Sequence, residues 1–263
     1  MTFQPIIPFS GASGWAFLQR TQEAQQDAFE KSPLIERDTA YFEENISKIT
    51  SGEELVKDYR LLKVALGAFG LDEDLPNKAF IQKVLDEGTL DEESFSNRMV
   101  DKRYFEMSKA FGFDLDPPNT QLSDFSTDIL ANYKTRQFEI AVGEQSTTMR
   151  LALGLERDLG DIIEGGNTPD GQWYSVMGNE PLREVFETAL GLPATFAALD
   201  IDKQLGVFRE KAQAIFGEGE VSQFADPDKL EELNRLFLVR SQIAEGTSSL
   251  SSGAIALTLL QSI

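Results

Sequence analysis

The sequence predicts an all-α, multihelical protein. Along most of its 263 residues, apolar side chains recur at spacings of three and four, which is the spacing of one helix face. The segments with this spacing end at glycine or proline, which stop helices. Only residues 172–176, "QWYSV", have the composition of a strand, and that signal is weak. We therefore expect helices throughout.

Residues 1–45 are predicted to form an N-terminal arm and a helix. The opening "MTFQPIIPFSGASG" is punctuated by Pro, Ser and Gly before "WAFLQRTQEAQQDAF". No basic residue precedes its apolar part, so it lacks the pattern of a cleavable signal peptide. We expect a cytoplasmic protein, or one exported by a route that uses an uncleaved N-terminus.

Residues 46–120 are predicted to form a first helical half. Its clearest helix spans 51–70, where Ser51 and Glu54 make a capping-box pattern and Gly70 stands where a helix ends. Lys57, Arg60 and Lys63 fall on its polar face. The apolar positions of the opposite face recur at helical spacing and are Leu55, Tyr59, Leu62, Leu66 and Phe69.

Shorter helices follow in this half and in the second, which spans residues 121–245. The first half continues with segments 77–88, 90–101 and 102–113, and the prolines of "DLDPPNT" make 114–120 a connector. A long helical stretch from Asp124 to Ile163 is expected to break near Gly143. The turn-rich segment 164–172 is expected to be an exposed loop. Helices are then predicted within 180–191, 202–217 and 226–246.

Two short sequence motifs each occur twice in the chain, in the same order, which indicates an internal duplication. "ALG" occurs at residues 65–67 and 152–154, and "AFG" at 110–112 is matched by "ALG" at 189–191. Duplication predicts two related helical halves packed together, with 50–113 equivalent to 137–192. The alternative is that "ALG" only reflects residues that favour helices and a glycine that stops them.

Composition excludes several classes of function. Asp and Glu number 44 against 24 Lys and Arg, and a net charge of −20 repels nucleic acid. No run reaches the roughly 18 apolar residues that a membrane span needs. The chain has no Cys and no His, so the usual zinc ligands and Ser-His-Asp or Cys-His catalysis are missing. We therefore name no catalytic, cofactor-binding or metal-binding residue and expect a protein that is not an enzyme.

Two groups of neighbouring residues could be read as ligand sites, and each also has a purely structural interpretation. The acidic run Asp72, Glu73 and Asp74 superficially resembles a calcium loop, but it lacks the central glycine and we interpret it as a solvated turn. Trp173 and Tyr174 follow the turn-rich loop. They are expected either to anchor that loop on the core or to stack on a ligand.

Candidate partner-binding residues lie at the two ends of the chain. Trp15 belongs to the N-terminal arm, whereas residues 246–263 are predicted to be a flexible Ser/Gly-rich linker and an apolar tail. Such a tail is too apolar for a solvated end, so it docks on the chain's own core or binds a protein partner. Its candidate residues are Ile255, Leu257, Leu259 and Leu260.

Two long segments resemble a bacterial family. Residues 53–113, "EELVKDYRLLKVALGAFG…SKAFGF", resemble the defining segment of the family called domain of unknown function 1217, and residues 11–42 resemble its usual N-terminal portion. Similar genes occur in bacterial flagellar gene clusters, so the resemblance implies a flagellum-associated role and a flagellar protein partner. It supplies no catalytic residue. The alternative is a helical module that binds a small ligand in a groove between its halves.

Overall fold

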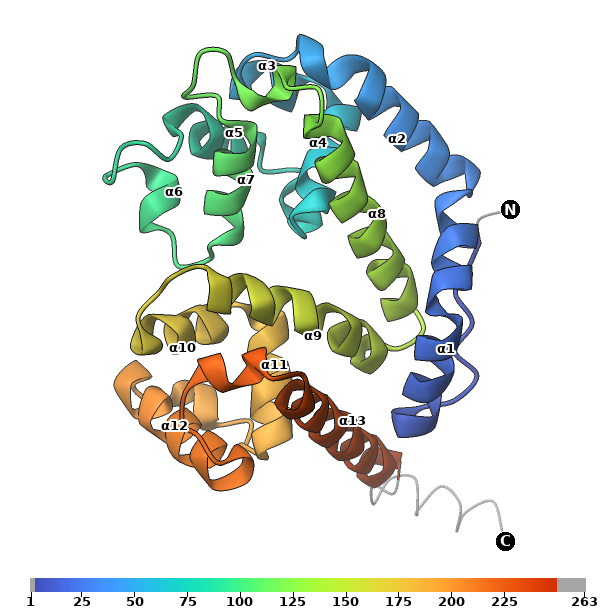
Figure 1. Ribbon diagram of the computed structural model, residues 1–263, viewed down its shortest axis with the longest axis vertical. Coiled ribbons are helices and arrows are strands. Elements are labelled where there is room, and N and C mark those ends of the chain that lie inside the picture. Colours follow the sequence, from blue (N-terminus) through green and yellow to red (C-terminus); the bar gives the residue numbers. More distant parts are fainter. Residues whose placement is uncertain (1–2, 250–263) are drawn as a thin grey trace, which may run out of the picture. The chain divides into compact units, whose positions relative to one another are not determined.

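The computed structural model describes residues 3–249 and is all-α over that range (Figure 1). The described residues form thirteen α-helices and five short 3-10 helices, with no strand among them. The predicted fold class is therefore confirmed. The weak strand signal at 172–176 is wrong, because these residues lie inside helix α10 (Pro169–Gly178).

The chain divides into two compact units whose boundaries differ from those expected. Unit 1 combines the residues up to Ile6 with Thr21–Glu144, and unit 2 combines Ile7–Arg20 with the residues from Gln145 onward. Helix α8, Phe125–Gly143, belongs to unit 1 because it packs against α4. The division therefore falls at 144, not at 120. The segment 1–45, predicted to be an N-terminal arm and a helix, contributes to both units.

Unit 1 is organised around helix α4, Tyr59–Ala68. Helix α4 packs against α2 and α8, and α3 packs against both α4 and α5 (Figure 1). From Leu61 to Ala68 every residue of α4 is buried except Lys63, so the helix forms the centre of this core. The other helices are α1 (Gly11–Glu30, shared with unit 2), α2 (Pro33–Asn45), α3 (Gly52–Lys57), α5 (Lys78–Glu87), α6 (Phe95–Arg98) and α7 (Arg103–Phe111).

The helix expected over 51–70 is two helices, α3 and α4, because Asp58 interrupts it. Asp58 has an extended backbone, and its Oδ1 accepts hydrogen bonds from the amides of Arg60 and Leu61 at 2.9 and 3.1 Å. This is N-cap geometry, which satisfies amides that have no partner within the helix. Tyr59, expected in the core, is consequently the first residue of α4 and is 57% exposed.

The predicted capping box at Ser51 and Glu54 forms in part. The Ser51 hydroxyl accepts from the Glu54 amide at 3.3 Å, as expected. The Glu54 carboxylate reaches one residue farther than the pattern requires and accepts from the amide of Thr50 at 2.8 Å. Gly70 has a φ of +68°, which confirms the left-handed residue expected at the end of this segment.

Replacing Asp58 with asparagine is expected to destabilise the protein in a pH-dependent way. Desolvation alone would raise the pKa of Asp58, but hydrogen bonds from Tyr41 and from the amides of Leu61 and Arg60 hold that pKa below its ordinary value of 3.8. A lowered carboxyl pKa stabilises the folded state above the unfolded value and loses this contribution as the pH falls through the folded value. The advantage of wild type over D58N should therefore be full near neutral pH and shrink below 3.8.

Urea unfolding of both proteins over a pH series measures this advantage. Asp27 is exposed, and its carboxylate makes no hydrogen bond or ion pair in the described structure, so D27N is the matched control. A D58N defect that stays constant across the acid range would contradict the assignment to the charged form of Asp58.

Unit 2 is built around helix α11, Glu180–Leu190, which packs against α9, α10, α12 and α13. The break expected near Gly143 is confirmed: α8 ends there and α9 begins at Thr147, where the Ser146 hydroxyl caps the amide of Met149 at 3.3 Å. The exposed loop expected at 164–172 is shorter than predicted, because α10 begins at Pro169. The remaining helices are α9 (Thr147–Glu164), α12 (Ile201–Phe216) and α13 (Pro227–Ser249).

The repeated phrases occupy different positions in their helices. Gly67 lies in the last turn of α4, whereas Gly154 lies in the middle of α9. The second pair of repeated segments, 110–112 and 189–191, agrees better. Gly112 and Gly191 each directly follow a helix and have left-handed φ values of +57° and +66°. The equivalence of 50–113 and 137–192 stays a prediction.

The segment expected to be a linker begins inside a helix. Residues 246–249 form the end of α13, so the helix extends farther than the Ser/Gly composition indicated. Residues 250–263, the rest of the linker and the apolar tail, lie outside the described residues.

Candidate functional site

The partner-binding residues expected at the two ends are only partly within the described structure. Trp15 lies on α1 and is half-buried, so it belongs to a helix and not to an extended arm. Ile255, Leu257, Leu259 and Leu260 lie outside the described residues.

The acidic run at 72–74 anchors a turn. The Asp72 carboxylate accepts from the amide nitrogen of Gln137 at 2.7 Å, and the Asp74 carboxylate accepts from the Tyr104 hydroxyl at 2.5 Å. These carboxylates therefore tie a short 3-10 turn to α7 and α8, which is a more specific role than the solvated turn expected. Between residues 3 and 249, no group of three or more Asp or Glu residues has an arrangement that could hold a metal ion. Over the same residues, no helix is both long enough and apolar enough to cross a membrane.

Trp173 has the anchoring role, one of the two alternatives that the sequence left open. Its side chain is fully buried on α10, and its ring stacks on Phe208 and meets the edge of Phe186, each at 5.3 Å between centroids. Its Nε1 donates to the Gly219 carbonyl at 2.9 Å. Both its apolar surface and its single donor are thus used inside unit 2.

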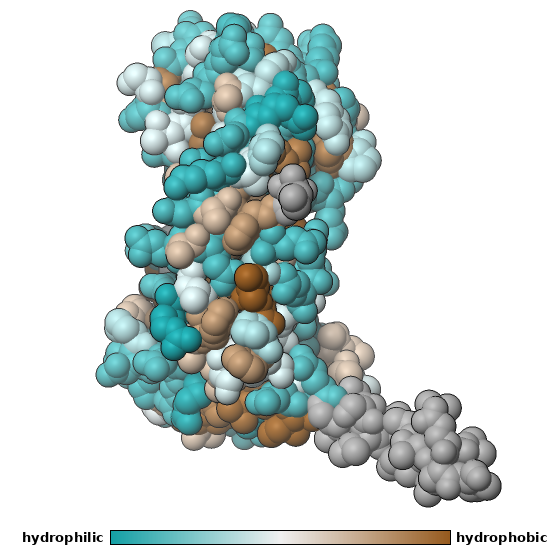
Figure 2. All heavy atoms as spheres, turned by 90° about the vertical axis from the view of Figure 1, so that its right-hand side faces the viewer, coloured by the Kyte–Doolittle hydropathy of each residue, from teal (hydrophilic) through white to brown (hydrophobic). Residues whose placement is uncertain are grey.

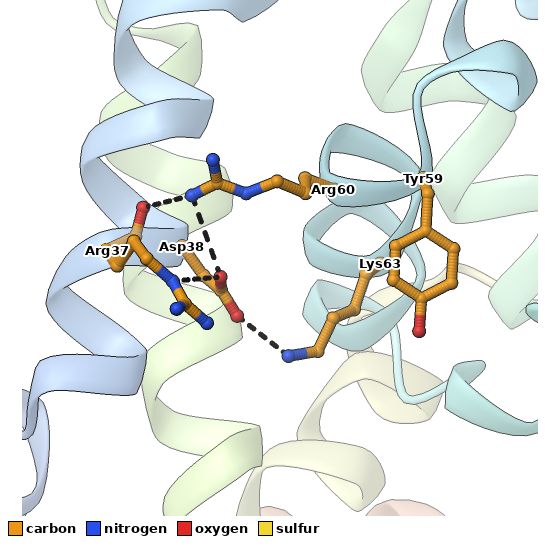
Figure 3. Close-up of a pocket in the computed structure, with 5 residues that line it drawn as sticks. All are labelled: Arg37, Asp38, Tyr59, Arg60 and Lys63. Atoms are coloured by element: carbon orange, nitrogen blue, oxygen red, sulfur yellow. Dashed lines mark hydrogen bonds and ion pairs between the residues drawn. The ribbon is translucent and has the colours of Figure 1, made fainter.

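A hollow of about 300 Å³ on unit 1 gathers the clearest set of charged side chains (Figure 3). Arg37 and Asp38 come from α2, whereas Tyr59, Arg60 and Lys63 come from α4. Arg60 and Lys63 share one face of α4 because they are three residues apart. The packing of α4 on α2 brings that face to Asp38.

Asp38 forms the floor of the hollow. It is buried, in line with the buried Ile35 and Phe42 on the same side of α2. The Lys63 ammonium donates to Asp38 Oδ2 at 2.7 Å. Arg37 Nε and Arg60 Nη2 each lie 3.9 Å from Oδ1, which is an ion-pair distance but too long for a hydrogen bond. One carboxylate thus draws three cations together.

Arg60 is held in place from two sides. Its Nη2 donates to the Arg37 carbonyl at 2.8 Å, and its guanidinium carbon lies 3.9 Å from the centre of the Tyr41 ring. The Tyr41 hydroxyl in turn donates to Asp58 Oδ2 at 2.7 Å. The residue that caps α4 therefore also fixes the aromatic ring on which Arg60 stacks.

Tyr133 lies close to Asp38 from the interior of the unit. Burial raises the pKa of the Tyr133 hydroxyl, and the negative charges of Asp38 and Asp72 raise it further. The hydroxyl is buried and has no hydrogen-bond partner of normal geometry among the described residues. The raised pKa keeps the Tyr133 hydroxyl protonated and uncharged near neutral pH, so it adds no charge beside Asp38.

The sequence pattern predicts only part of this hollow. Helical spacing places Arg60 and Lys63 on the polar face of their helix, but it does not indicate that Arg37 and Asp38 join them. The sequence does contain a signal for Asp38. This residue falls three positions after Ile35 and four before Phe42, on the helix face where an apolar residue is normally found. An acidic residue at a core position predicts a buried partner, although it does not say which one.

Comparison with known proteins gives a family and a fold. The model of the family described as "Protein of unknown function (DUF1217)" matches residues 68–230. The X-ray crystal structure of protein AGR_C_984 from Agrobacterium tumefaciens is similar, with a TM-score of 0.75 and 25% sequence identity, and the match covers 92% of this chain and 99% of that one. No curated protein matches the chain significantly.

Proposed function

The chain belongs to the DUF1217 family of proteins of unknown function, and we propose that it is a structural or protein-interaction protein of the bacterial flagellum. It acts by protein contacts and not by catalysis. The flagellar part of the proposal is supported by the resemblance of residues 11–42 and 53–113 to a family whose genes are found among flagellar gene clusters. A chain without cysteine is also typical of proteins exported through the flagellar core.

An apolar stripe on α13 carries the interaction part of the proposal. Leu236, Val239 and Ile243 recur at spacings of three and four, so they share one helix face. Val239 is 40% exposed and Ile243 is 60% exposed. On the face drawn in Figure 2, hydrophilic residues predominate and hydrophobic ones form small groups between them. Apolar side chains aligned on one helix face of a protein with charge −20 are well suited to a protein partner.

Removing residues 254–263 is expected to impair partner binding while leaving the melting temperature within a few degrees of wild type, about the shift that 1 kcal/mol produces. Each Leu or Ile that becomes fully buried contributes roughly 1.5–3 kcal/mol, so a few such residues are enough to drive association. If the tail were instead part of the core, the same arithmetic predicts a loss of several kcal/mol. Thermal melts separate these two results.

Co-purification from flagellated cells that carry the gene provides the binding measurement, with the bound proteins identified. The V239S/I243S variant tests the stripe on α13, and Y174F, altered at an exposed hydroxyl of α10, is the control. We expect wild type to retain a flagellar protein, and we expect the truncated protein and the V239S/I243S variant to lose it. Equal retention by all variants, or no flagellar protein with wild type, would contradict the proposal.

A further inference from the structure

We propose that the hollow between α2 and α4 binds an oxyanion, that is, a carboxylate or phosphate group, through Arg37, Arg60 and Lys63. This goes beyond the proposed function, which concerns α13 and the tail. In Figure 3 the charged ends of these three side chains converge on Asp38, and the Tyr59 ring stands beside Lys63 at the rim. The lining carries three positive charges and one negative charge.

The cations exceed what Asp38 requires. Lys63 alone gives Asp38 a short, charged hydrogen bond, and neither guanidinium donates to that carboxylate. Nη1 and Nη2 of Arg37, and Nε and Nη1 of Arg60, make no hydrogen bond to the protein among the described residues. These N–H groups are free to bind a ligand, and the planar fork of a guanidinium matches the paired oxygens of carboxylate and phosphate.

Asp38 arranges the cations for a ligand. Three like charges would spread apart without a carboxylate among them. Arg60 is further fixed by the Tyr41 ring and the Arg37 carbonyl, so its orientation requires little ordering on binding. The Arg37 side chain is 66% exposed and can close over a bound group.

The local charge differs in sign from that of the whole chain. The chain as a whole carries −20, whereas the four charged lining residues carry +2. The range of electrostatic interaction is about 10 Å at 0.1 M salt, so a small anion in the hollow responds mainly to the nearby cations. A hollow of about 300 Å³ accommodates a phosphate ion or the carboxylate of a glutamate side chain.

Isothermal titration of the full chain at low ionic strength tests the site with two probes, inorganic phosphate and an acetylated tri-glutamate peptide. We expect saturable binding to wild type, weakened about tenfold or more in R37Q and in R60Q because each loses charged hydrogen-bond donors. R98Q makes the same charge change at an exposed arginine on α6 and should bind like wild type. Added sodium chloride should weaken binding.

If wild type binds phosphate but not the peptide, the site is assigned to free anions. If wild type binds the peptide and phosphate displaces it, the site is assigned to acidic side chains. Both results support the oxyanion site. The proposal is overturned if wild type binds neither probe saturably up to roughly 10 mM. It is also overturned if R98Q weakens binding as much as R37Q and R60Q do. Arg37 makes no short side-chain contact in the described structure, so R37Q should melt like wild type and decides the test even if R60Q unfolds.

Discussion

Replacing Trp173 with alanine is expected to lower the free energy of unfolding by about 3–5 kcal/mol, the usual cost of deleting a buried aromatic ring. The ring is fully buried between Phe208 and Phe186, so its removal leaves a cavity in the centre of unit 2. The Gly219 carbonyl also loses the donor that Nε1 supplies at 2.9 Å.

Chemical denaturation followed by circular dichroism measures this loss, and the fluorescence of the remaining tryptophan, Trp15, provides a second probe. The matched control is Y174F, one residue along the same helix, which removes only an exposed hydrogen bond to Asp202. Its effect should lie within about 0.5 kcal/mol. A W173A protein that unfolds like Y174F would show that the packing around Trp173 does not stabilise unit 2.

The strand signal at 172–176 failed for a physical reason. Trp, Tyr and Val favour strands because they suit a pleated, half-buried surface, but this preference depends on context. Here Pro169 stands in the first turn of α10, and the Thr168 hydroxyl caps the amide of Gly171 at 3.1 Å. Burial of Trp173 among the aromatic rings of α11 and α12 then favours the helix. The start signals at 168 and 169 were readable in the sequence.

The break at Asp58 shows a different limit. The apolar spacing across 51–70 continues through position 58, so periodicity alone joins α3 to α4. Asp is nevertheless a preferred N-cap residue. Its hydrogen bonds to two amides show that one local preference outweighed an uninterrupted apolar pattern.

The hollow required tertiary information. Helical periodicity predicts that Arg60 and Lys63 share one helix face, and they do share a face of α4. Their meeting with Asp38 joins residues 22 and 25 positions apart on separate helices. No local pattern specifies which two helices pack together, so the ion cluster could not be derived before the fold was known.

Substituting Gly67 with valine is expected to destabilise unit 1 by about 1–3 kcal/mol, although glycine is an unfavourable residue in a helix. Gly67 is the glycine of the repeated phrase, and it lies in α4 where that helix meets α8. A Cβ atom at this position would lie 2.9 Å from Cδ2 and Cε2 of Tyr133, closer than carbon atoms approach in proteins. Tyr133 is fully buried, so its ring has little room to withdraw.

Denaturation of G67V beside G160A separates the clash from the general effect of losing a helix glycine. Gly160 lies inside α9, and nothing lies within 4 Å of a Cβ added there, so G160A should stabilise the protein by up to about 1 kcal/mol. Combining G67V with Y133L, which removes the ring, should cost less than the sum of the two single substitutions, because the clash is then relieved. Additive costs would show that close approach to Tyr133 is not why glycine occupies position 67.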